Sequence, residues 1–337
     1  MIQDALTTLL AGRSLDRAEA RAVMEEIMAG EATEAQIGGF LIALRLKGET
    51  PDEIAGFAEA IRDCGLTVSP KRTDLVDTAG TGGDGQATIN ISTAAALVAA
   101  AAGAGVAKHG NRAVSSASGS ADVLEALGFT LDVSPERLAD SIDELGFGFL
   151  FAPTHHPGFR HAAPVRKELA TRTVFNVLGP LCNPAGARAQ VVGVYEPALV
   201  RTIAEVLARL GSHRAFVVHG AYGIDELSPA GPNFVCEVRD GDVIERQIDP
   251  RDYGIAPSAP EELRGGSPEQ NAAVILAVFS GEERGAKRDA ILLNAAGAIA
   301  AGYHAEDLRE GLEVAREAVD SGAAAERLEA LIAFSHG

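Results

Sequence analysis

A glycine-rich run with two acids, DTAGTGGDG at residues 77–85, stands at the end of a short apolar stretch. Gly80, Gly82 and Gly85 fit the G-x-G-x-x-G pattern, in which a tight turn brings backbone N–H groups close to a diphosphate. The segment NISTAAA at 90–96 follows, and a helix is expected to begin there. A glycine turn and a helix N-terminus both attract negative charge, so this arrangement favours a bound phosphate.

The residues after this turn indicate which phosphate ligand it suits. A dinucleotide site needs an Asp or Glu about 20 residues later for the ribose hydroxyls, but the 37 residues of 85–121 contain no carboxylate. The same stretch holds Lys108, His109 and Arg112. A P-loop is also excluded, because Gln86 stands where that motif needs lysine. The stretch therefore predicts a strongly anionic ligand such as a diphosphate, with a simple tight turn as the alternative.

A second basic segment lies at residues 155–172, HHPGFRHAAPVRKELATR, where Glu168 is the only acid. Arginine forks bind carboxylates in bidentate fashion, so Arg166 or Arg172 could hold a carboxylated substrate. For each of these arginines a solvated helix face is the alternative interpretation. The three histidines of this segment lack the cysteine or spaced acids that a transition-metal site needs.

Asp225 and Glu226 are adjacent in HGAYGIDELSP at 219–229, directly after an apolar stretch. Neighbouring carboxylates in a phosphate-binding protein suit Mg²⁺, which prefers oxygen ligands and bridges protein acids to phosphate oxygens. Ordinary surface charge is the alternative. The sequence contains no G-x-S-x-G elbow, so a serine hydrolase of that type has no support.

The composition is that of an anionic globular chain of 337 residues, 47% of them apolar, which suffices for one large or two moderate domains. Its 29 Lys and Arg against 47 Asp and Glu give a net charge of −18, which argues against nucleic acid and anionic membranes as partners. The three cysteines form no C-x-x-C pair and indicate a reducing cytoplasm. The N-terminus lacks signal-peptide features, and the apolar stretch 94–107 is predicted to be a buried helix rather than a membrane span.

The first 65 residues have the glycine spacing and the helix-start signals of a helical domain. Glycines follow four stretches of helical periodicity, where a left-handed C-terminal cap would require them: Gly12, Gly30, Gly48 and Gly65. Two helix starts have capping-box spacing, Thr33 with Gln36 and Thr50 with Glu53. This segment therefore predicts four helices.

From Asp74 the pattern changes to short β-rich runs separated by helical stretches, which predicts an α/β domain. The predicted strands are LVDTAG at 75–80, GFTLDV at 128–133, FGFLFAP at 147–153, AQVVGVYEP at 189–197, RAFVVHG at 214–220 and FVCEVRDGDVI at 234–244. Residues 162–180 look helical, and either cover the sheet or return to the helical domain. Three helical stretches are expected after Pro268.

Four segments together closely resemble the anthranilate phosphoribosyltransferase family, in order and over nearly the whole chain. They are the glycine-rich run at 77–85 and the segments at 90–128, 163–185 and 217–232. The resemblance implies transfer of the phosphoribosyl group of phosphoribosyl pyrophosphate to the amine of anthranilate, with release of pyrophosphate, in tryptophan biosynthesis. It also implies Mg²⁺ as cofactor and a homodimer paired through the helical part.

The fold that the resemblance implies is α/β, with a small all-helical domain and a larger α/β domain around a mostly parallel central sheet, as in nucleoside phosphorylases and phosphoribosyltransferases. Both domains are then discontinuous. The helical domain is expected to comprise residues 1–66 and about 165–185, and the α/β domain residues 67–164 and about 186–337.

The family motifs also imply roles for individual residues. Those expected to bind phosphoribosyl pyrophosphate are Gly80, Thr81, Gly82, Gly83, Asp84, Thr88, Asn90, Ser92, Thr93, Lys108 and Ser120. Those expected to bind anthranilate are Gly80, His109, Asn111, His155 and Arg166, with Arg166 on the carboxylate. Those expected to hold Mg²⁺ are Ser92, Asp225 and Glu226. Catalysis is expected to be electrostatic, through Lys108, Asp225 and Glu226, without an acid-base dyad.

Three residues depart from the family pattern: Ala117 stands where a basic residue is common, Ile89 where an aromatic is common, and Asn233 where threonine is common. Two rival functions share the fold. A pyrimidine nucleoside phosphorylase would need a different lysine- and serine-rich phosphate signature, and KHGNR at 108–112 favours the transferase. A nucleic-acid-binding relative would need a basic surface, which the net charge of −18 contradicts.

Overall fold

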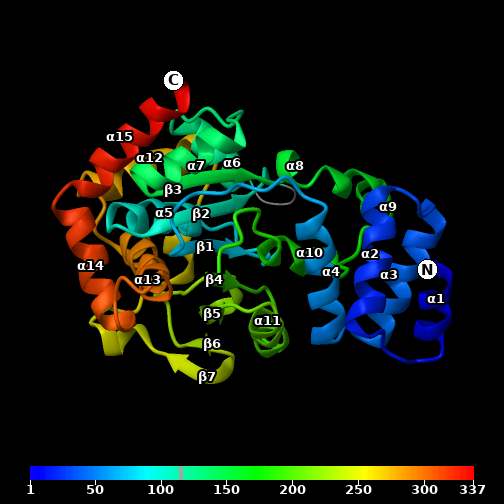
Figure 1. Ribbon diagram of the computed structural model, residues 1–337. Helices are drawn as coiled ribbons and strands as arrows, with labels where there is room; N and C mark the ends of the chain where they lie inside the picture. The colour runs from blue at the N-terminus through cyan, green and yellow to red at the C-terminus, as the bar shows by residue number, and fades with distance from the viewer. Residues whose placement is uncertain (114–116) are drawn as a thin grey trace.

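The computed structural model describes residues 1–113 and 117–337. Figure 1 shows a helical bundle beside a larger body built on one β-sheet. The bundle consists of α1 (Ile2–Leu10), α2 (Arg17–Ala29), α3 (Glu34–Lys47) and α4 (Pro51–Asp63). The four predicted N-terminal helices are confirmed.

Both predicted capping boxes are present in the bundle. Thr33 accepts a hydrogen bond from the Gln36 N–H, and Thr50 accepts one from the Glu53 N–H. The side chains of Gln36 and Glu53 in turn accept the N–H groups of the two cap residues. Each box satisfies N–H groups that have no partner inside the helix, which fixes where α3 and α4 begin.

Gly12, Gly30 and Gly48 have positive φ, as predicted for glycines after helices. The prediction is wrong for Gly65, because the residue that caps α4 is Cys64, with φ −84°, and Gly65 is not left-handed. A Cβ at residue 65 would lie 2.8 Å from Nδ1 of His156. Glycine is therefore required here by the close approach of a second chain segment.

The larger part contains a seven-stranded sheet in the order β3-β2-β1-β4-β5-β6-β7. The strands are β1 (Leu75–Gly80), β2 (Gly105–Gly110), β3 (Phe147–Phe151), β4 (Ala189–Gly193), β5 (Arg214–His219), β6 (Asn233–Arg239) and β7 (Asp242–Ile248). Strands β1 to β5 are parallel and β6 and β7 antiparallel, so the mostly parallel sheet is confirmed. The strand order reverses between β1 and β4, where Gly80 pairs with Gly193, and ligands of open parallel sheets bind at such a point.

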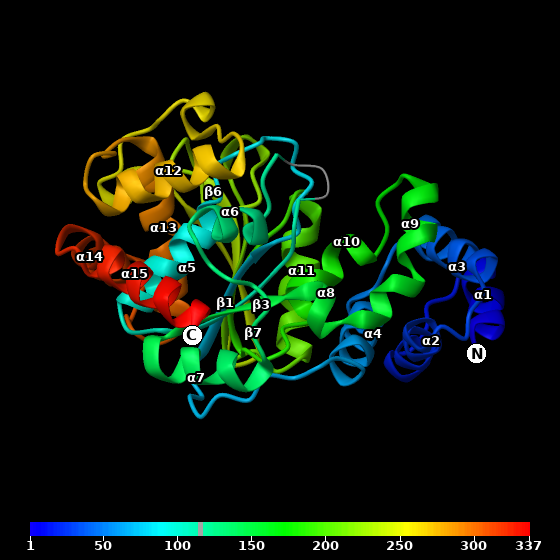
Figure 2. The same ribbon diagram turned by 90° about the horizontal axis from the view of Figure 1, so that it is seen from above.

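Helices cover both faces of the sheet (Figure 2). On one face lie α5 (Ile91–Ala101) and α13 (Ala286–Ala301), and on the other α7 (Pro135–Leu145) and α11 (Ala198–Arg209). Since α11 also packs against α4, its core is continuous with the core of the bundle. The remaining helices of this part are α6 (Ser120–Ala126), α8 (Ala152–His155), α12 (Pro268–Phe279), α14 (Leu308–Asp320) and α15 (Ala323–His336). Across the described residues, no helix is long and apolar enough to cross a membrane.

Several sequence predictions in this part are wrong. The predicted buried helix at 94–107 ends at Ala101, because Gly103 turns the chain with φ 100° and β2 begins at Gly105. The segment 128–133 is not a strand, since the Thr130 N–H donates to a side chain of α15 instead of a neighbouring strand. Residues 234–244 fall in two strands, β6 and β7, and four helices rather than three follow Pro268.

The ambiguous segment 162–180 returns to the bundle. It forms α9 (Ala163–Leu169) and α10 (Phe175–Leu178), followed by a 3₁₀ turn at Gly179–Leu181. Helix α9 packs against α3 and α10 against α4. Val165 and Phe175 are buried in the same core as the bundle helices. These contacts support the discontinuous division of the chain, whose boundaries stay a prediction.

Candidate active site

The glycine-rich turn connects the carboxyl end of β1 to α5, and its geometry requires glycine. Gly82, Gly83 and Gly85 have φ of 65°, 76° and 74°. The Gly82 N–H donates a hydrogen bond of 2.7 Å to Oδ2 of Asp225. A Cβ at Gly80 would collide with the same carboxylate oxygen. The turn and the loop after β5 are therefore built to meet at the end of β1.

Asp84, Asp225 and Glu226 interact electrostatically beside this turn. Burial and the Asp84 carboxylate raise the pKa of Asp225 to about 6. Burial and the Asp225 carboxylate hold the pKa of Glu226 well above its usual range. Oδ2 of Asp84 and Oε2 of Glu226 are buried and have no hydrogen-bond partner among the described residues. Unpaired carboxylate oxygens that repel one another are stabilised by a bound cation.

The residues predicted to hold Mg²⁺ lie together. The Ser92 N–H donates to Oε1 of Glu226 at 3.4 Å, and Asp225 is the residue directly before Glu226. Within 1–113 and 117–337, no three His, Cys, Asp or Glu side chains are arranged to hold a metal ion by themselves. Mg²⁺ typically takes one or two carboxylates and completes its octahedron with water and phosphate oxygens. The donors present fit that pattern, with a phosphate ligand supplying the remaining oxygens.

Lys108 is a buried cation, 1% exposed, next to these acids. Its Nζ donates to the carbonyl of Thr78 and lies 3.4 Å from Oγ of Ser92. Burial lowers the pKa of Lys108 to about 8, and the charges of Asp77 and Glu226 oppose this shift. The ammonium is therefore mostly charged at neutral pH and faces the predicted Mg²⁺ ligands.

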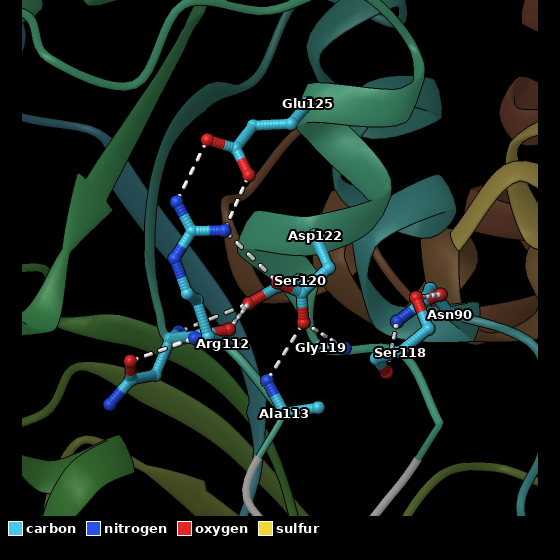
Figure 3. A network of polar contacts seen from close by, with 9 residues as sticks. Asn90, Arg112, Ala113, Ser118, Gly119, Ser120, Asp122 and Glu125 are labelled. Atoms are coloured by element: carbon cyan, nitrogen blue, oxygen red, sulfur yellow. Dashed lines mark hydrogen bonds and ion pairs between the residues drawn. The ribbon is translucent and has the colours of Figure 1, made fainter. Parts of the chain in front are cut away.

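The start of α5 is tied to two distant segments. Asn90 donates to the carbonyl of Ser118 and accepts a hydrogen bond from the Ser118 hydroxyl (Figure 3). It also accepts a hydrogen bond from the side chain of Asn271. Thr93, also predicted to bind phosphate, is buried, and its hydroxyl has no partner in the described chain. Asn90 thus connects the start of α5 to these two segments, and its predicted phosphate contact stays a prediction.

Arg112 does not supply free positive charge, in contrast to what its place in the carboxylate-free stretch predicts. Its guanidinium is paired with Asp122 and Glu125 (Figure 3). The N–O distances of these ion pairs are 3.1 Å and 2.5 Å, respectively. Oδ2 of Asp122 also accepts the N–H groups of Ala113 and Gly119. The acids that neutralise Arg112 stand just beyond the end of that stretch. The positive charge available to a ligand is therefore smaller than the carboxylate-free stretch predicts.

His109 follows Lys108 in β2 and points to the opposite face of the sheet, and Asn111 lies just beyond the strand. Nδ1 of His109 donates to the carbonyl of Gly179 at 3.1 Å, so Nε2 carries no proton. That Nε2 is buried without a partner among the described residues, and burial lowers the pKa of His109 to about 3. Asn111 exchanges backbone hydrogen bonds with the hydroxyl of Ser120. The predicted acceptor and phosphate residues are therefore adjacent here.

Two arginines of the return segment take different positions. Arg166 on α9 lies 5.2 Å from the ring centre of Phe175. Burial lowers its pKa, and no carboxylate of the described chain pairs with it. Arg172 stacks on Tyr195 and donates to the carbonyl of Gly83. Arg166 is thus a partly buried cation without a carboxylate partner in the described chain, and it is available for a substrate carboxylate. Arg172 instead contacts the glycine turn, a position that its sequence context does not indicate.

His155 is 1% exposed and its Nδ1 donates to the carbonyl of Leu66 at 2.8 Å, so it lies between chain segments. Among the departures from the family pattern, Ile89 is buried and Ala117 is exposed. Asn233 is buried, and its side chain makes hydrogen bonds to the backbone of Ser228 in the loop after Glu226. Asparagine at 233 therefore organises the loop that carries the acids.

Comparison with known proteins places this geometry in a family. Residues 3–65 match the "Glycosyl transferase family, helical bundle domain" and residues 72–325 the "Glycosyl transferase family, a/b domain". The anthranilate phosphoribosyltransferase of an Anaeromyxobacter species is 54% identical over 340 aligned residues, covering 100% of this chain and 99% of that protein. The chain belongs to the anthranilate phosphoribosyltransferase family.

Solved anthranilate phosphoribosyltransferases share the whole fold. The enzyme from Thermus thermophilus is 48% identical, with a TM-score of 0.95 over 99% of this chain and 100% of that one. The enzyme from Saccharomyces cerevisiae, in complex with PRPP (phosphoribosyl pyrophosphate) and Mg, is 29% identical, with a TM-score of 0.90 over 99% of this chain and 98% of that one. A further structure of the yeast enzyme contains 4-fluoroanthranilate.

Within this anthranilate phosphoribosyltransferase fold, Asp77 is a residue for which the sequence indicated no role. It is fully buried and accepts hydrogen bonds from the His109 N–H at 3.1 Å and from Nδ2 of Asn183 at 2.8 Å. Burial raises the pKa of Asp77 to about 6. Its position as the first acid of the glycine-rich run was the available signal, but its partner Asn183 lies 106 residues away.

Proposed function

We propose that this chain transfers the phosphoribosyl group of phosphoribosyl pyrophosphate to the amine of anthranilate and releases pyrophosphate, a step of tryptophan biosynthesis. The observation that supports this most is the meeting of the glycine turn with Asp225 and Glu226 at the point where the strand order reverses. A buried oxygen of Glu226 without a partner in the described chain, beside a glycine turn whose residues Gly83 and Gly85 are exposed, suits a metal-chelated diphosphate. The ligands of the yeast relative are consistent with this assignment.

Cleavage of the bond between ribose C1 and pyrophosphate leaves negative charge on the leaving group and positive charge on the sugar. The turn at 80–85 and the Lys108 ammonium lie where the leaving group would bind, and both become more favourable as its charge grows. Mg²⁺, when bound by Ser92, Asp225 and Glu226, would neutralise pyrophosphate oxygens. The protein therefore contributes mainly preorganised charge.

The acceptor needs orientation more than activation. An aryl amine is neutral near pH 7, so its lone pair is available without a strong general base. Arg166, which has no acidic partner in the described chain, would bind the anthranilate carboxylate in bidentate fashion. Nε2 of His109 carries no proton and would accept a hydrogen bond from the amine. Two such contacts fix the direction in which the nitrogen faces C1.

The test is a mixture of the purified protein with phosphoribosyl pyrophosphate, Mg²⁺ and anthranilate. We expect loss of anthranilate fluorescence with release of one pyrophosphate per anthranilate consumed, and no reaction in excess EDTA. Cleavage of a pyrimidine nucleoside by phosphate would support the phosphorylase instead, and tight binding of DNA or RNA without turnover would support the nucleic-acid-binding relative. Either result in the absence of anthranilate consumption contradicts the proposal.

The remaining expectations concern the protein in the cell. We propose a homodimer formed through the helical bundle, supported by two exposed apolar side chains there, Leu10 on α1 at 78% and Leu46 on α3 at 83%. The family resemblance implies this pairing, and a contact through the bundle would remove these apolar side chains from water. A cytoplasmic location is proposed because all three cysteines are free.

A further inference from the structure

The chain passes between the helical bundle and the sheet three times. The first crossing, residues 64–74, connects α4 to β1, and the second, residues 152–162, connects β3 to α9. The third, residues 179–188, connects α10 to β4. Arg166 lies on the bundle side of these crossings and the glycine turn on the sheet side. The crossings therefore determine how the two halves of the proposed active site face each other.

The first two crossings are joined by a reciprocal pair of hydrogen bonds. Nδ1 of His155 donates to the carbonyl of Leu66 at 2.8 Å, and the Leu66 N–H donates to the carbonyl of His155 at 2.7 Å. A Cβ at Gly65 would lie 3.1 Å from the same His155 carbonyl and 2.8 Å from His156. The two segments are in direct contact, and only glycine permits their close approach.

The second and third crossings are joined by the neighbouring histidine. Nε2 of His156 donates to the carbonyl of Cys182 at 2.8 Å, and His156 is 3% exposed. Its ring packs edge-on against the ring of His109, with 5.1 Å between ring centres. The Val68 N–H completes the connection by donating to the carbonyl of Pro184 at 3.1 Å.

The third crossing is held from several directions at once. Its consecutive carbonyls at 179, 180, 181 and 182 each accept a side-chain hydrogen bond from a different element. The donors are His109 of β2, Gln190 of β4, Arg62 of α4 and His156 of the second crossing, in that order. Asn183 then donates to Asp77 of β1. A backbone so fully bonded to its surroundings is a rigid joint rather than a linker.

We propose that His155 and His156 are positioning residues for the proposed transfer: through Nδ1 of one and Nε2 of the other, they join the three crossings and fix Arg166 opposite the glycine turn. This inference rests on the proposed function. Neither histidine needs to touch a substrate, so the residues act on the acceptor side through the placement of α9. The assignment replaces the expectation that His155 lines the anthranilate pocket.

The two histidines donate through different ring nitrogens, Nδ1 in His155 and Nε2 in His156. Each can therefore be replaced by an amide that matches its donor position and by one that does not. The amide nitrogen of asparagine reaches the position of Nδ1, and that of glutamine the position of Nε2. We expect His155→Asn and His156→Gln to keep the Michaelis constant for anthranilate within about threefold of the parent chain. We expect His155→Gln and His156→Asn to raise it by about tenfold or more, because small misplacements of a positioning group cost rate steeply. The dissociation constant of phosphoribosyl pyrophosphate should stay unchanged in all four variants.

Control variants separate this effect from loss of folding. His161→Asn and His161→Gln change a histidine of the second crossing whose ring, among the described residues, hydrogen-bonds only to Arg160, and both should leave the kinetics unchanged. Thermal melting checks that each variant folds. If a mismatched variant does not fold, Gly65→Ala provides the second test, since its methyl group would displace His156 without removing a donor, and it should raise the same Michaelis constant.

The outcomes are distinguishable. An inactive parent chain overturns the proposed function. An active parent chain whose folded matched and mismatched variants behave alike overturns the positioning assignment, as does an equal effect on both substrates. An effect of the mismatched variants alone, confined to anthranilate, supports it.

Discussion

At the scale of residues, the chemistry of the site depends on a few polar atoms whose hydrogen bonds are incomplete. Oε2 of Glu226 and Nε2 of His109 are buried without partners, and Arg166 has no acid to pair with in the part of the chain described. Unsatisfied buried groups reduce stability and are rare in folded proteins. Here they lie where an anionic donor and an aromatic amine acceptor would bind. The bound substrates would supply the missing partners, which explains why the protein keeps groups that reduce its stability.

The acid pair gives the first prediction. Asp225→Asn combined with Glu226→Gln should lower turnover by about 100- to 1,000-fold, because the charge that holds the metal and so neutralises the leaving group is removed. Turnover is measured by anthranilate fluorescence over a range of Mg²⁺ concentrations. The matched control is Asp240→Asn with Asp242→Asn, which removes two charges from the β6–β7 hairpin. Full activity of the Asp225/Glu226 variant at limiting Mg²⁺ would refute the metal assignment.

The second prediction at this scale concerns Arg166 and the binding of anthranilate. Arg166→Ala should raise the Michaelis constant for anthranilate by about tenfold or more, with a smaller effect on binding of phosphoribosyl pyrophosphate. Arg166→Lys should be intermediate, since lysine keeps the charge but not the fork. Lys167→Ala, the exposed neighbour on α9, is the control. Unchanged saturation by anthranilate in the alanine variant would remove this role.

At the scale of elements, the glycine turn, α5 and the loop after β5 could be predicted because their signals are local: glycines, a helix start and adjacent acids. Strand β2 could not be predicted, because its small residues Gly105 and Ala107 continue the composition of α5 and only the turn at Gly103 separates the two elements. The role of Asp77 was equally hidden, since its buried partners come from β2 and the third crossing.

The raised pKa of Asp77 leads to a prediction about how the free energy of unfolding depends on pH. Its pKa is raised from 3.8 to about 6, so between these values the folded state binds more protons than the unfolded state. The free energy of unfolding therefore falls as pH rises through this range, by roughly 3 kcal/mol from this group. Asp77→Asn cannot titrate, so its unfolding free energy should lack that share of the fall. Urea unfolding at pH 4 to 7 measures it, with the exposed Asp140→Asn as control. A difference from the parent chain that does not vary with pH would contradict the assignment.

At the scale of the whole molecule, the sequence predicted the two-part architecture but not how the parts are joined. The family resemblance indicated that residues near 165–185 return to the bundle, and α9 and α10 pack there. The joint itself consists of hydrogen bonds from side chains to carbonyls between segments about 30 to 120 residues apart, and no local pattern encodes such contacts.

The proposed dimer is a prediction at this scale. Leu46→Glu with Leu10→Glu should convert a particle of twice the chain mass of 34.8 kDa into one of that mass, measured by light scattering after gel filtration. Charges buried at an apolar interface oppose association. Leu276→Glu on α12, also an exposed leucine, should leave the mass unchanged. A parent chain that is already monomeric would contradict the proposal.

A crystal structure of the protein soaked with phosphoribosyl pyrophosphate and Mg²⁺ tests whether the glycine turn and the acid pair bind the sugar diphosphate. We expect the diphosphate to lie against the turn at 80–85, with the metal between it and Asp225 or Glu226 and with Lys108 close by. A structure in which the turn stays empty while the sugar diphosphate binds elsewhere would contradict this expectation.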